Sequence, residues 1–204
     1  NPATYYVATT GNDANAGTTL QPWATLDKAL APAVPGDTVI FRDGVYTQNA
    51  RKLQTNDGTA SNPITFMAEN VGGAIWRWTV TAPAGVGRFS MFGNYVTIDG
   101  IRFESTVIEV GNFSDQMIRI WEGTGQKLLN CTITGAWQPI KSNAGQVEIA
   151  HCTLLDGIGI DLYGNNSTLV HHNTIYLDDD GIGVYCKGGS RSCQFWANEI
   201  HGVG

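Results

Sequence analysis

The sequence predicts an all-β protein that folds as a right-handed parallel β-helix, a solenoid of about eight coils. Three observations support this prediction. Short segments resemble one another along the chain, each alternates as a strand does, and Gly, Asn and Asp separate them. Cys131, Cys152, Asn173 and Asn198 occupy equivalent positions in four such segments, at intervals of 21, 21 and 25 residues. Self-similarity at this period is typical of a solenoid.

A second set of equivalent positions follows the first. Ile140, Ile160 and Val184 lie in short runs, and the run Asp156-Gly-Ile-Gly-Ile160 is nearly repeated as Asp180-Gly-Ile-Gly-Val184. Leucine-rich repeats have a similar period, but their Leu-rich pattern with helices is absent here. The repeats therefore favour coils made of strands and tight corners.

Composition limits the function classes. The chain has 204 residues, of which 42% are hydrophobic, 15% are charged and 25 are Gly, and its net charge is -6. This suits one β-rich domain over residues 1–204 with many turns. The negative charge disfavours a general nucleic-acid surface, and a polyanionic substrate would need a local cationic patch or a bound cation. No apolar run approaches the length of about 20 residues that a membrane helix needs.

The N-terminal part predicts a strand, a loop, a helix and a second strand in that order. Residues 4–8 alternate as a strand and residues 11–17 are typical of a loop. Apolar residues from Trp23 to Val34 fall near helical spacing, with Thr25 as N-cap. Residues 37–42 are strand again. We expect the helix to form an N-terminal cap, because the first coil of a solenoid needs its open apolar end covered.

Four N-terminal segments resemble secreted right-handed β-helix proteins, of which the family-nine pectate lyases are the most similar characterised group. The segments are Tyr5–Asp13, Trp23–Leu30, Pro35–Tyr46 and Gly58–Thr65. The resemblance covers about 100 residues closely. It implies a secreted or cell-surface protein, a parallel β-helix, and activity on an acidic polysaccharide. In this family, Asp residues of adjacent coils hold calcium and a Lys acts as base.

The middle of the chain continues the strand pattern, with one interruption. Strand-type runs occupy residues 64–68, 74–80, 89–92 and 95–103. The interval between the equivalent positions Ile101 and Cys131 is 30 residues, which predicts an insertion around residues 107–113 that borders a binding groove. The chain ends at Gly204 after a strand and shows no C-terminal cap, so we expect a fragment of a longer protein.

Four cysteines fall into two pairs. Cys131 and Cys152 are one coil apart, where strands lie about 4.8 Å from each other, a spacing that suits a disulfide. Cys186 and Cys193 bracket a short loop. A disulfide in either pair would favour an oxidising compartment. The alternative is that all four are buried thiols.

The strands at Ile118, Ile140, Ile160 and Val184 carry the candidate substrate-binding residues. If these aliphatic residues point inward, their neighbours point to solvent. The outward residues are Arg119, Trp121, Lys141, Asp161, Tyr163, Tyr185 and Lys187. We expect Trp121, Lys141, Asp161 and Tyr185 in one row and Tyr163 beside Lys187 in the next. Aromatic rings stack on sugars and cations meet carboxylates, so this face suits an acidic polymer. The alternative is an ordinary solvated face.

An acidic cluster lies at the adjacent corner. Asp178, Asp179 and Asp180 follow Asp156 by one coil, and we place Asp156 opposite Asp180. Carboxylates this close repel one another unless a cation lies between them, and oxygen ligands suit Ca²⁺. Asp180-Gly181 resembles the Asp-Gly corner of the pectate lyase family. However, Gly183 stands where a further acidic ligand is expected, and the family's base lies on a later coil than Lys187. The alternative is that these Asp residues cap turns.

The histidines offer a weaker hypothesis. His151 and His172 share a position beside the Cys/Asn column, so a two-His metal site is conceivable. The sequence shows no third ligand, and a stacked polar ladder at the corner is the favoured interpretation.

Three functions remain open. The first is a calcium-dependent polysaccharide lyase on a uronate-containing glycan. Its base would be Lys187 or Lys141, with Arg191 or calcium lowering the pKa of the lysine. The second is a glycan-binding or adhesive β-helix that needs no base. The third is a glycoside hydrolase, with Asp161 and one Asp of residues 178–180 as its carboxylates.

Overall fold

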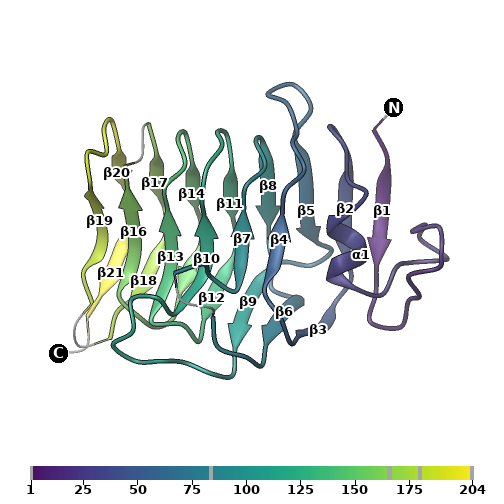
Figure 1. Ribbon diagram of the computed structural model, residues 1–204, viewed down its shortest axis with the longest axis horizontal. Helices are drawn as coiled ribbons and strands as arrows, with labels where there is room; N and C mark the ends of the chain where they lie inside the picture. The colour runs from purple at the N-terminus through teal and green to yellow at the C-terminus, as the bar shows by residue number, and fades with distance from the viewer. Residues whose placement is uncertain (1, 83–84, 165–166, 179–180, 203–204) are drawn as a thin grey trace.

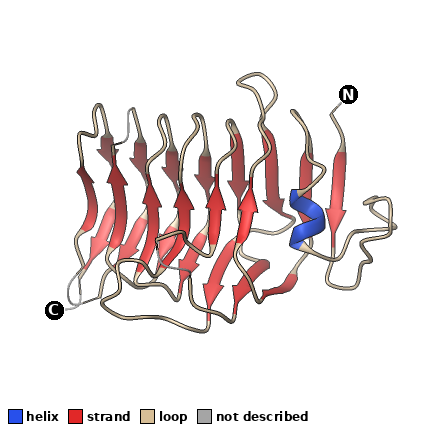
Figure 2. Ribbon diagram, in the orientation of Figure 1, coloured by secondary structure: helices blue, strands red, loops and turns tan. Residues whose placement is uncertain are grey.

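The computed structural model describes residues 2–82, 85–164, 167–178 and 181–202, and it confirms the predicted parallel β-helix. The chain winds through three sheets, which we call A, B and C, and every strand pairing between coils is parallel. Figure 1 shows the coils stacked from the N-terminal end to the C-terminal end, and Figure 2 shows strands throughout, with one short helix. That helix is too short to span a membrane, and no other described helix could do so.

Sheet A contains one strand from each of eight successive coils, as the repeat period predicts. Its strands are β1 (Thr4–Val7), β2 (Thr38–Phe41), β5 (Ile64–Ala68), β8 (Val96–Asp99), β11 (Lys127–Leu129), β14 (Glu148–Ala150), β17 (Leu169–His171) and β20 (Gln194–Trp196).

In every coil after the first, sheet B follows sheet A. Its strands are β3 (Gly44–Gln48), β6 (Ala74–Trp78), β9 (Arg102–Ser105), β12 (Thr132–Thr134), β15 (Thr153–Leu154), β18 (Thr174–Tyr176) and β21 (Glu199–His201).

Sheet C completes the coil and carries the predicted substrate-binding residues. Its strands are β4 (Lys52–Gln54), β7 (Phe89–Met91), β10 (Gln116–Ile120), β13 (Gln138–Ser142), β16 (Gly159–Tyr163) and β19 (Gly183–Lys187).

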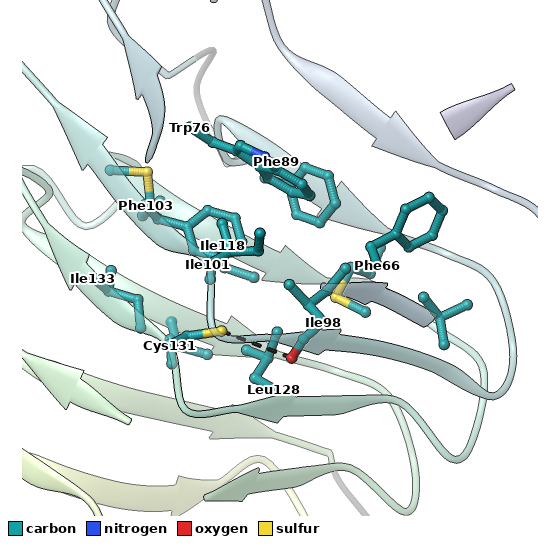
Figure 3. Close-up of a cluster of buried hydrophobic side chains, with 14 of the residues drawn as sticks. Phe66, Trp76, Phe89, Ile98, Ile101, Phe103, Ile118, Leu128, Cys131 and Ile133 are labelled. Atoms are coloured by element: carbon teal, nitrogen blue, oxygen red, sulfur yellow. Dashed lines mark hydrogen bonds between the residues drawn. The ribbon is translucent and has the colours of Figure 1, made fainter. Parts of the chain in front are cut away.

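The core consists of aligned columns of apolar side chains, one residue per coil. In sheet A the register aligns Val39, Phe66, Ile98, Leu128, Ile149 and Val170. In sheet B it aligns Tyr46, Trp76, Phe103, Ile133, Leu154 and Ile175. Figure 3 shows part of this core, where Trp76 contacts Phe89 and Phe103 with ring centroids 5.3 and 5.2 Å apart. The column in sheet C includes Ile140, Ile160 and Val184, as the repeats predict.

The helix α1 (Leu26–Leu30) is much shorter than the cap expected over residues 23–34. Thr25 is the N-cap, as predicted, and its Oγ1 accepts a hydrogen bond from Lys28 N. Leu26, Ala29 and Leu30 pack into the core, and α1 continues the row of sheet C strands beyond β4 (Figure 1). Pro32 and Pro35 explain the early end, since proline cannot continue a helix. A helix covering the end of the solenoid is therefore not established.

The corner between sheets A and B repeats in backbone and side chain. Asn130, His151, His172 and Ala197 occupy it in successive coils, all with φ between 51° and 56°. Beside it, Asn173 Oδ1 accepts a hydrogen bond from Cys152 N at 2.9 Å, and Asn198 Oδ1 accepts one from Asn173 N at 3.1 Å. The Asn side chains therefore tie neighbouring coils together.

All four cysteines are free thiols in the structure. Cys131 and Cys152 lie in neighbouring coils as expected, but each thiol faces backbone carbonyl groups. Cys131 Sγ lies 3.7 Å from Ile98 O, the dashed contact in Figure 3, and Cys152 Sγ lies 3.4 Å from Ala150 O. Burial raises the pKa of the Cys131 thiol well above its ordinary value, and the neighbouring Cys152 adds to this.

The predicted insertion is the loop between β9 and β10, and a buried ion pair attaches it to the solenoid. Arg88 Nη1 lies 2.7 Å from Asp115 Oδ1, and both side chains are 0% exposed. Arg88 also donates to the carbonyls of Val80 and Val107. Asp115 Oδ2 accepts a hydrogen bond from Trp137 N on the next coil. The pair thus holds the loop beside the N-terminal ends of the sheet C strands.

Candidate functional site

The outer face of sheet C brings most of the predicted site residues together. The register aligns Arg119 with Lys141, Lys141 with Asp161, and Asp161 with Tyr185. Trp121 does not lie in this row, contrary to our expectation. Because Ile120 pairs with both Met91 and Ser142, Arg119 takes the place predicted for Trp121. Tyr163 pairs with Lys187 in the next row, as expected.

Asp161 is the centre of this row. Its side chain is 1% exposed, and its Oδ2 lies 3.4 Å from Lys141 Nζ and 3.3 Å from Lys187 Nζ. Gln138 Nε2 donates to the same oxygen at 3.1 Å and lies 3.4 Å from the Tyr185 hydroxyl. A buried carboxylate is stable only when paired in this way. Asp161 therefore holds two amines in fixed positions on the face.

Aromatic rings flank the charged groups. The Arg119 guanidinium lies 4.2 Å from the centroid of the Trp121 ring. The rings of Phe92 and Trp121 stack with their centroids 6.2 Å apart. Lys187 Nζ lies 4.6 Å from the centroid of the Tyr185 ring. Aromatic rings next to cations suit a ligand that has both apolar sugar faces and carboxylates.

Burial and the Asp161 carboxylate set the protonation of the row. Burial alone would lower the pKa of Lys187, but Asp161 and Tyr185 raise it above its ordinary value. Burial, with a contribution from Asp161, also raises the pKa of the Tyr185 phenol. Lys187 is therefore a cation and Tyr185 a neutral phenol at neutral pH. The condition that we set for Lys187 as base, a lowered pKa, is not met.

Several buried polar atoms on this face have no hydrogen-bond partner among the described residues. They are Arg119 Nε, Trp121 Nε1, Gln138 Oε1 and Asp161 Oδ1. Buried polar groups are nearly always hydrogen-bonded in native proteins, and the exceptions call for an explanation. A bound polar ligand would supply partners to such atoms, as ordered water would.

Arg191 lies apart from these groups. It is exposed in the loop that follows β19, where its carbonyl accepts a hydrogen bond from Ser167 N at 2.9 Å. No contact between its guanidinium and Lys187 occurs among the described residues. Besides burial, the groups that shift the pKa of Lys187 are Asp161 and Tyr185, and Arg191 is not one of them.

At the acidic corner, Asp156 and Asp178 act as the turn caps that the sequence analysis gives as the alternative to calcium ligands. Asp156 accepts hydrogen bonds from Thr134 Oγ1 at 2.7 Å and from Gly135 N at 2.9 Å. Asp178 Oδ2 accepts one from Gly157 N at 2.9 Å. The two carboxylates thus cap equivalent turns of successive coils, and Asp178 repeats the role of Asp156. Within the described part of the chain, no group of three acidic ligands forms a cation site here. Asp179 and Asp180 lie outside the described residues.

Sequence reasoning missed Gln138. Strict alternation assigns it to the interior with Ile140, yet its side chain reaches Asp161. The signal for this exception is Pro139, which cannot donate a ladder hydrogen bond and often marks an irregular strand.

Comparison with known proteins places these features in a family. A model of the right-handed β-helix region of Pel9A-like proteins matches residues 5–170. No curated protein matches the chain by sequence.

Solved structures show the same fold at low identity. A rhamnogalacturonan lyase is 18% identical with a TM-score of 0.66, over 99% of this chain and 60% of the other. The pectin methylesterase PemA from Erwinia chrysanthemi is 11% identical with a TM-score of 0.62, over 85% and 55%. The pectate lyase Pel9A is 13% identical with a TM-score of 0.54, over 97% and 78%. The chain thus spans less than two thirds of the length of the rhamnogalacturonan lyase and of the pectin methylesterase.

The family match covers most of the chain, and the three parallel sheets agree with it. The resemblance inferred from the N-terminal segments is confirmed, as is the right-handed parallel β-helix. The chain belongs to the Pel9A-like right-handed β-helix family.

Proposed function

We propose that this protein binds a uronate-containing polysaccharide along the outer face of sheet C and cleaves it by β-elimination. The observation that carries the proposal is the cluster around Asp161, where two lysines and Tyr185 meet in a row that begins at Arg119. The net charge of -6 makes this local concentration of cations the natural place for a polyanion. The lyases among the structural neighbours support the proposal at the level of the fold.

The reaction needs three groups. A cation neutralises the uronate carboxylate, a base removes the proton on the adjacent carbon, and an acid protonates the departing sugar oxygen. The electron pair of the broken C–H bond forms a carbon–carbon double bond as the bond to the 4-linked sugar breaks. A positioned base of this kind contributes roughly 10²–10⁴-fold to the rate.

The residues of the row fit these three tasks. Lys187 remains cationic because its pKa is raised, and its side chain is 46% exposed, so it suits the carboxylate. Lys141 lies on the other side of Asp161 and is the amine assigned as base. Tyr185 keeps its proton, since its pKa is also raised, and it is the candidate acid for the leaving oxygen. Trp121 and Tyr163 would stack on neighbouring sugar rings.

Calcium has no part in these steps. The described carboxylates Asp156 and Asp178 cap turns and do not by themselves fit a calcium site. A calcium site at this corner stays a proposal that depends on Asp179 and Asp180. Secretion or display on the cell surface is also a proposal, supported by the N-terminal resemblance and by the size of a polymeric substrate.

The test is to incubate the protein with polygalacturonate, rhamnogalacturonan and alginate while following the ultraviolet absorbance of the unsaturated product. Lys141→Ala should lower turnover by at least about 10². Lys187→Ala should mainly raise KM. Lys127→Ala is the matched control for Lys187→Ala. Both lysine side chains are 46% exposed and both pair with a carboxylate, but Lys127 lies on sheet A. Full activity of Lys141→Ala would remove it as the base.

One observation favours a second function, glycan binding without turnover. Both amines near Asp161 form ion pairs with it, and the raised pKa of Lys187 favours the charged form of that lysine. Affinity electrophoresis in gels containing the same polymers separates the two cases. Retardation that Lys187→Ala abolishes, without unsaturated product from any polymer, would select the binding function.

A further inference from the structure

The only three-residue group of metal-ligating side chains among the described residues consists of His151, His171 and His172. It lies at the corner between sheets A and B, on a different side of the solenoid from sheet C. One ligand nitrogen from each ring lies within 4.8 Å of the other two. The sequence suggested only His151 and His172, and the structure adds His171 as a third ligand.

The backbone explains why the three rings converge. His151 and His172 occupy the same left-handed corner position in successive coils, with φ of 56° and 54°, and their rings stack with centroids 5.0 Å apart. His171 is the last residue of β17 and precedes the corner. Its ring stands nearly perpendicular to both others, at 86°. The coil spacing thus brings together nitrogens from two coils.

Glu148 fixes the orientation of His171. Its Oε1 lies 3.3 Å from His171 Nε2, and its Oε2 lies 2.7 Å from Lys127 Nζ. When Nε2 donates to this carboxylate, Nδ1 keeps its lone pair, and Nδ1 faces His172 Nδ1 at 2.9 Å. A carboxylate behind a ligating histidine is a recurrent feature of metal sites, because it sets the tautomer and raises the basicity of the ligand. Trp196 stacks on the His171 ring at 4.2 Å and holds it in place.

The distance between the two Nδ1 atoms suits a transition metal. Two nitrogens that each lie about 2.0–2.1 Å from one ion are about 2.9 Å apart at a right angle and about 3.3 Å apart in a tetrahedron. Imidazole ligands favour Zn²⁺, Cu²⁺ and Ni²⁺, whereas Ca²⁺ and Mg²⁺ prefer oxygen. We propose that His151, His171 and His172 form a binding site for a divalent transition-metal ion, with Glu148 orienting His171.

Binding would require one change of tautomer. With the His171 hydrogen on Nε2, the hydrogen of the contact between the two Nδ1 atoms belongs to His172. That hydrogen moves to Nε2 of the same His172 ring, which frees the Nδ1 lone pair without loss of a proton. Three protein ligands leave the remaining coordination positions to water. This site is independent of the proposed lyase activity.

The experiment is calorimetric titration of EDTA-treated, dialysed protein with ZnCl₂ and CuCl₂, with CaCl₂ as the comparison. We expect one Zn²⁺ or Cu²⁺ to bind per chain. His171→Ala should abolish this binding. His201→Ala is the matched control, because His201 is the one histidine of the four outside the group, and it should bind as the wild type does.

Two further variants keep the test informative if His171→Ala fails to fold. His172→Asn places at the corner the residue that Asn130 already provides there, so it keeps the left-handed backbone while removing a ligand. It should weaken binding at least about tenfold, and Glu148→Gln should weaken it about 10–100-fold. The nitrogen couplings in the electron paramagnetic resonance spectrum of bound Cu²⁺ should decrease in His172→Asn. Unchanged affinity in both His171→Ala and His172→Asn, or no binding by the folded wild type, would overturn the proposal.

Discussion

Asp161 shows how one buried group organises the functional face. Its carboxylate is buried, and two amines and the Gln138 amide converge on one oxygen. The cost of burying the charge is offset only while these partners stay in place. Asp161 therefore acts as the anchor that positions Lys141 and Lys187.

Replacing Asp161 tests this anchoring role. Asp161→Asn keeps the shape but removes the charge, and we expect a loss of about 1–3 kcal/mol in the free energy of unfolding. Urea unfolding measures it. Glu104→Gln, which weakens a more exposed pair with Arg77, should cost no more than about 1 kcal/mol. Equal effects of the two substitutions would contradict the anchoring role.

Glu148 gives the protein a pH dependence at the opposite corner. Burial alone would raise the pKa of Glu148, but Lys127 and His171 lower it below its ordinary value of 4.5. A lowered pKa contributes stability that is present above 4.5 and is lost as the pH falls through the lowered value. In buffer with EDTA, Glu148→Gln should therefore cost up to about 1 kcal/mol at pH 7 and nothing in stronger acid.

Chemical denaturation of both proteins across this pH range measures the difference. The exposed Glu199 supplies the control, since Glu199→Gln should leave the free energy of unfolding unchanged at both ends of the range. A cost of Glu148→Gln that persists in strong acid would mean that the substitution disturbs packing and not charge.

The loop between β9 and β10 is the element that departs most from the repeat. Its attachment depends on the Arg88–Asp115 pair, which is buried on both sides. Removing one partner of such a pair leaves an uncompensated buried charge. The loop position, beside the first residues of the sheet C strands, therefore depends on two side chains.

Asp115→Asn should destabilise the protein by about 3–5 kcal/mol. The double variant Arg88→Met/Asp115→Leu should recover part of this loss, because no unpaired charge remains. Guanidinium unfolding of the single and double variants provides the comparison, and Arg77→Met serves as the surface control. A double variant no more stable than Asp115→Asn would show that the hydrogen bonds of the pair, and not its charges, hold the loop.

The acidic corner allows a turn cap to be separated from a calcium ligand. Asp178→Asn keeps an oxygen that accepts from Gly157 N, whereas Asp178→Ala removes it. If Asp178 is only a cap, Asn should preserve the melting temperature and Ala should cost about 1 kcal/mol. The measurement is thermal unfolding with calcium and with EDTA. A calcium-dependent stabilisation that Asp178→Asn removes would identify a ligand role and establish the calcium proposal.

At the scale of the whole molecule, stability depends on the interfaces between successive coils, since each coil contacts only its neighbours. Asn173 connects neighbouring coils. It is buried, accepts from Cys152 N, and donates to Ile149 O at 3.0 Å and to Asn198 Oδ1 at 2.9 Å. Its loss would leave groups in two coils without partners.

Asn173→Ala should reduce the free energy of unfolding by at least about 2 kcal/mol, because it leaves more than one buried group unpaired. Hydrogen exchange should locate the effect: amides of β14, β17 and β20 should exchange faster, while those of β1 and β2 should not change. Uniform acceleration along the whole chain would contradict nearest-neighbour stability.

Much of this fold could be predicted because the residues that repeat along the sequence are those whose side chains face the core. The column of Ile140, Ile160 and Val184 is recovered residue for residue. Periodicity cannot supply the register between strands outside the clear repeats, which is why Arg119 and not Trp121 joins the row of Lys141.

The candidate site was predictable in composition but not in electrostatics. Alternation identified Lys141, Asp161 and Lys187, yet the convergence of both amines on one buried oxygen depends on side-chain conformations that no sequence pattern encodes. Equally, the 21-residue spacing predicted stacked histidines, but the third ring comes from the strand end and not from the repeat. The turn cap at Asp178 could not be predicted from the Asp-Gly dipeptides, because they pointed to Asp156 and Asp180, and Asp180 lies outside the described residues.

The regular register between successive coils has an evolutionary consequence. Glu148 pairs with Leu169 across one coil, so residues 148–168 form a unit that a gene could duplicate in frame without disturbing the pairings above or below it. Each copy would lengthen the molecule by one strand spacing, about 4.8 Å. It would also carry a second Asp161 along the outer face. Selection on the number of such units could thus adjust the length of the outer face that we propose as the polysaccharide site, while the pattern of each unit stays the same.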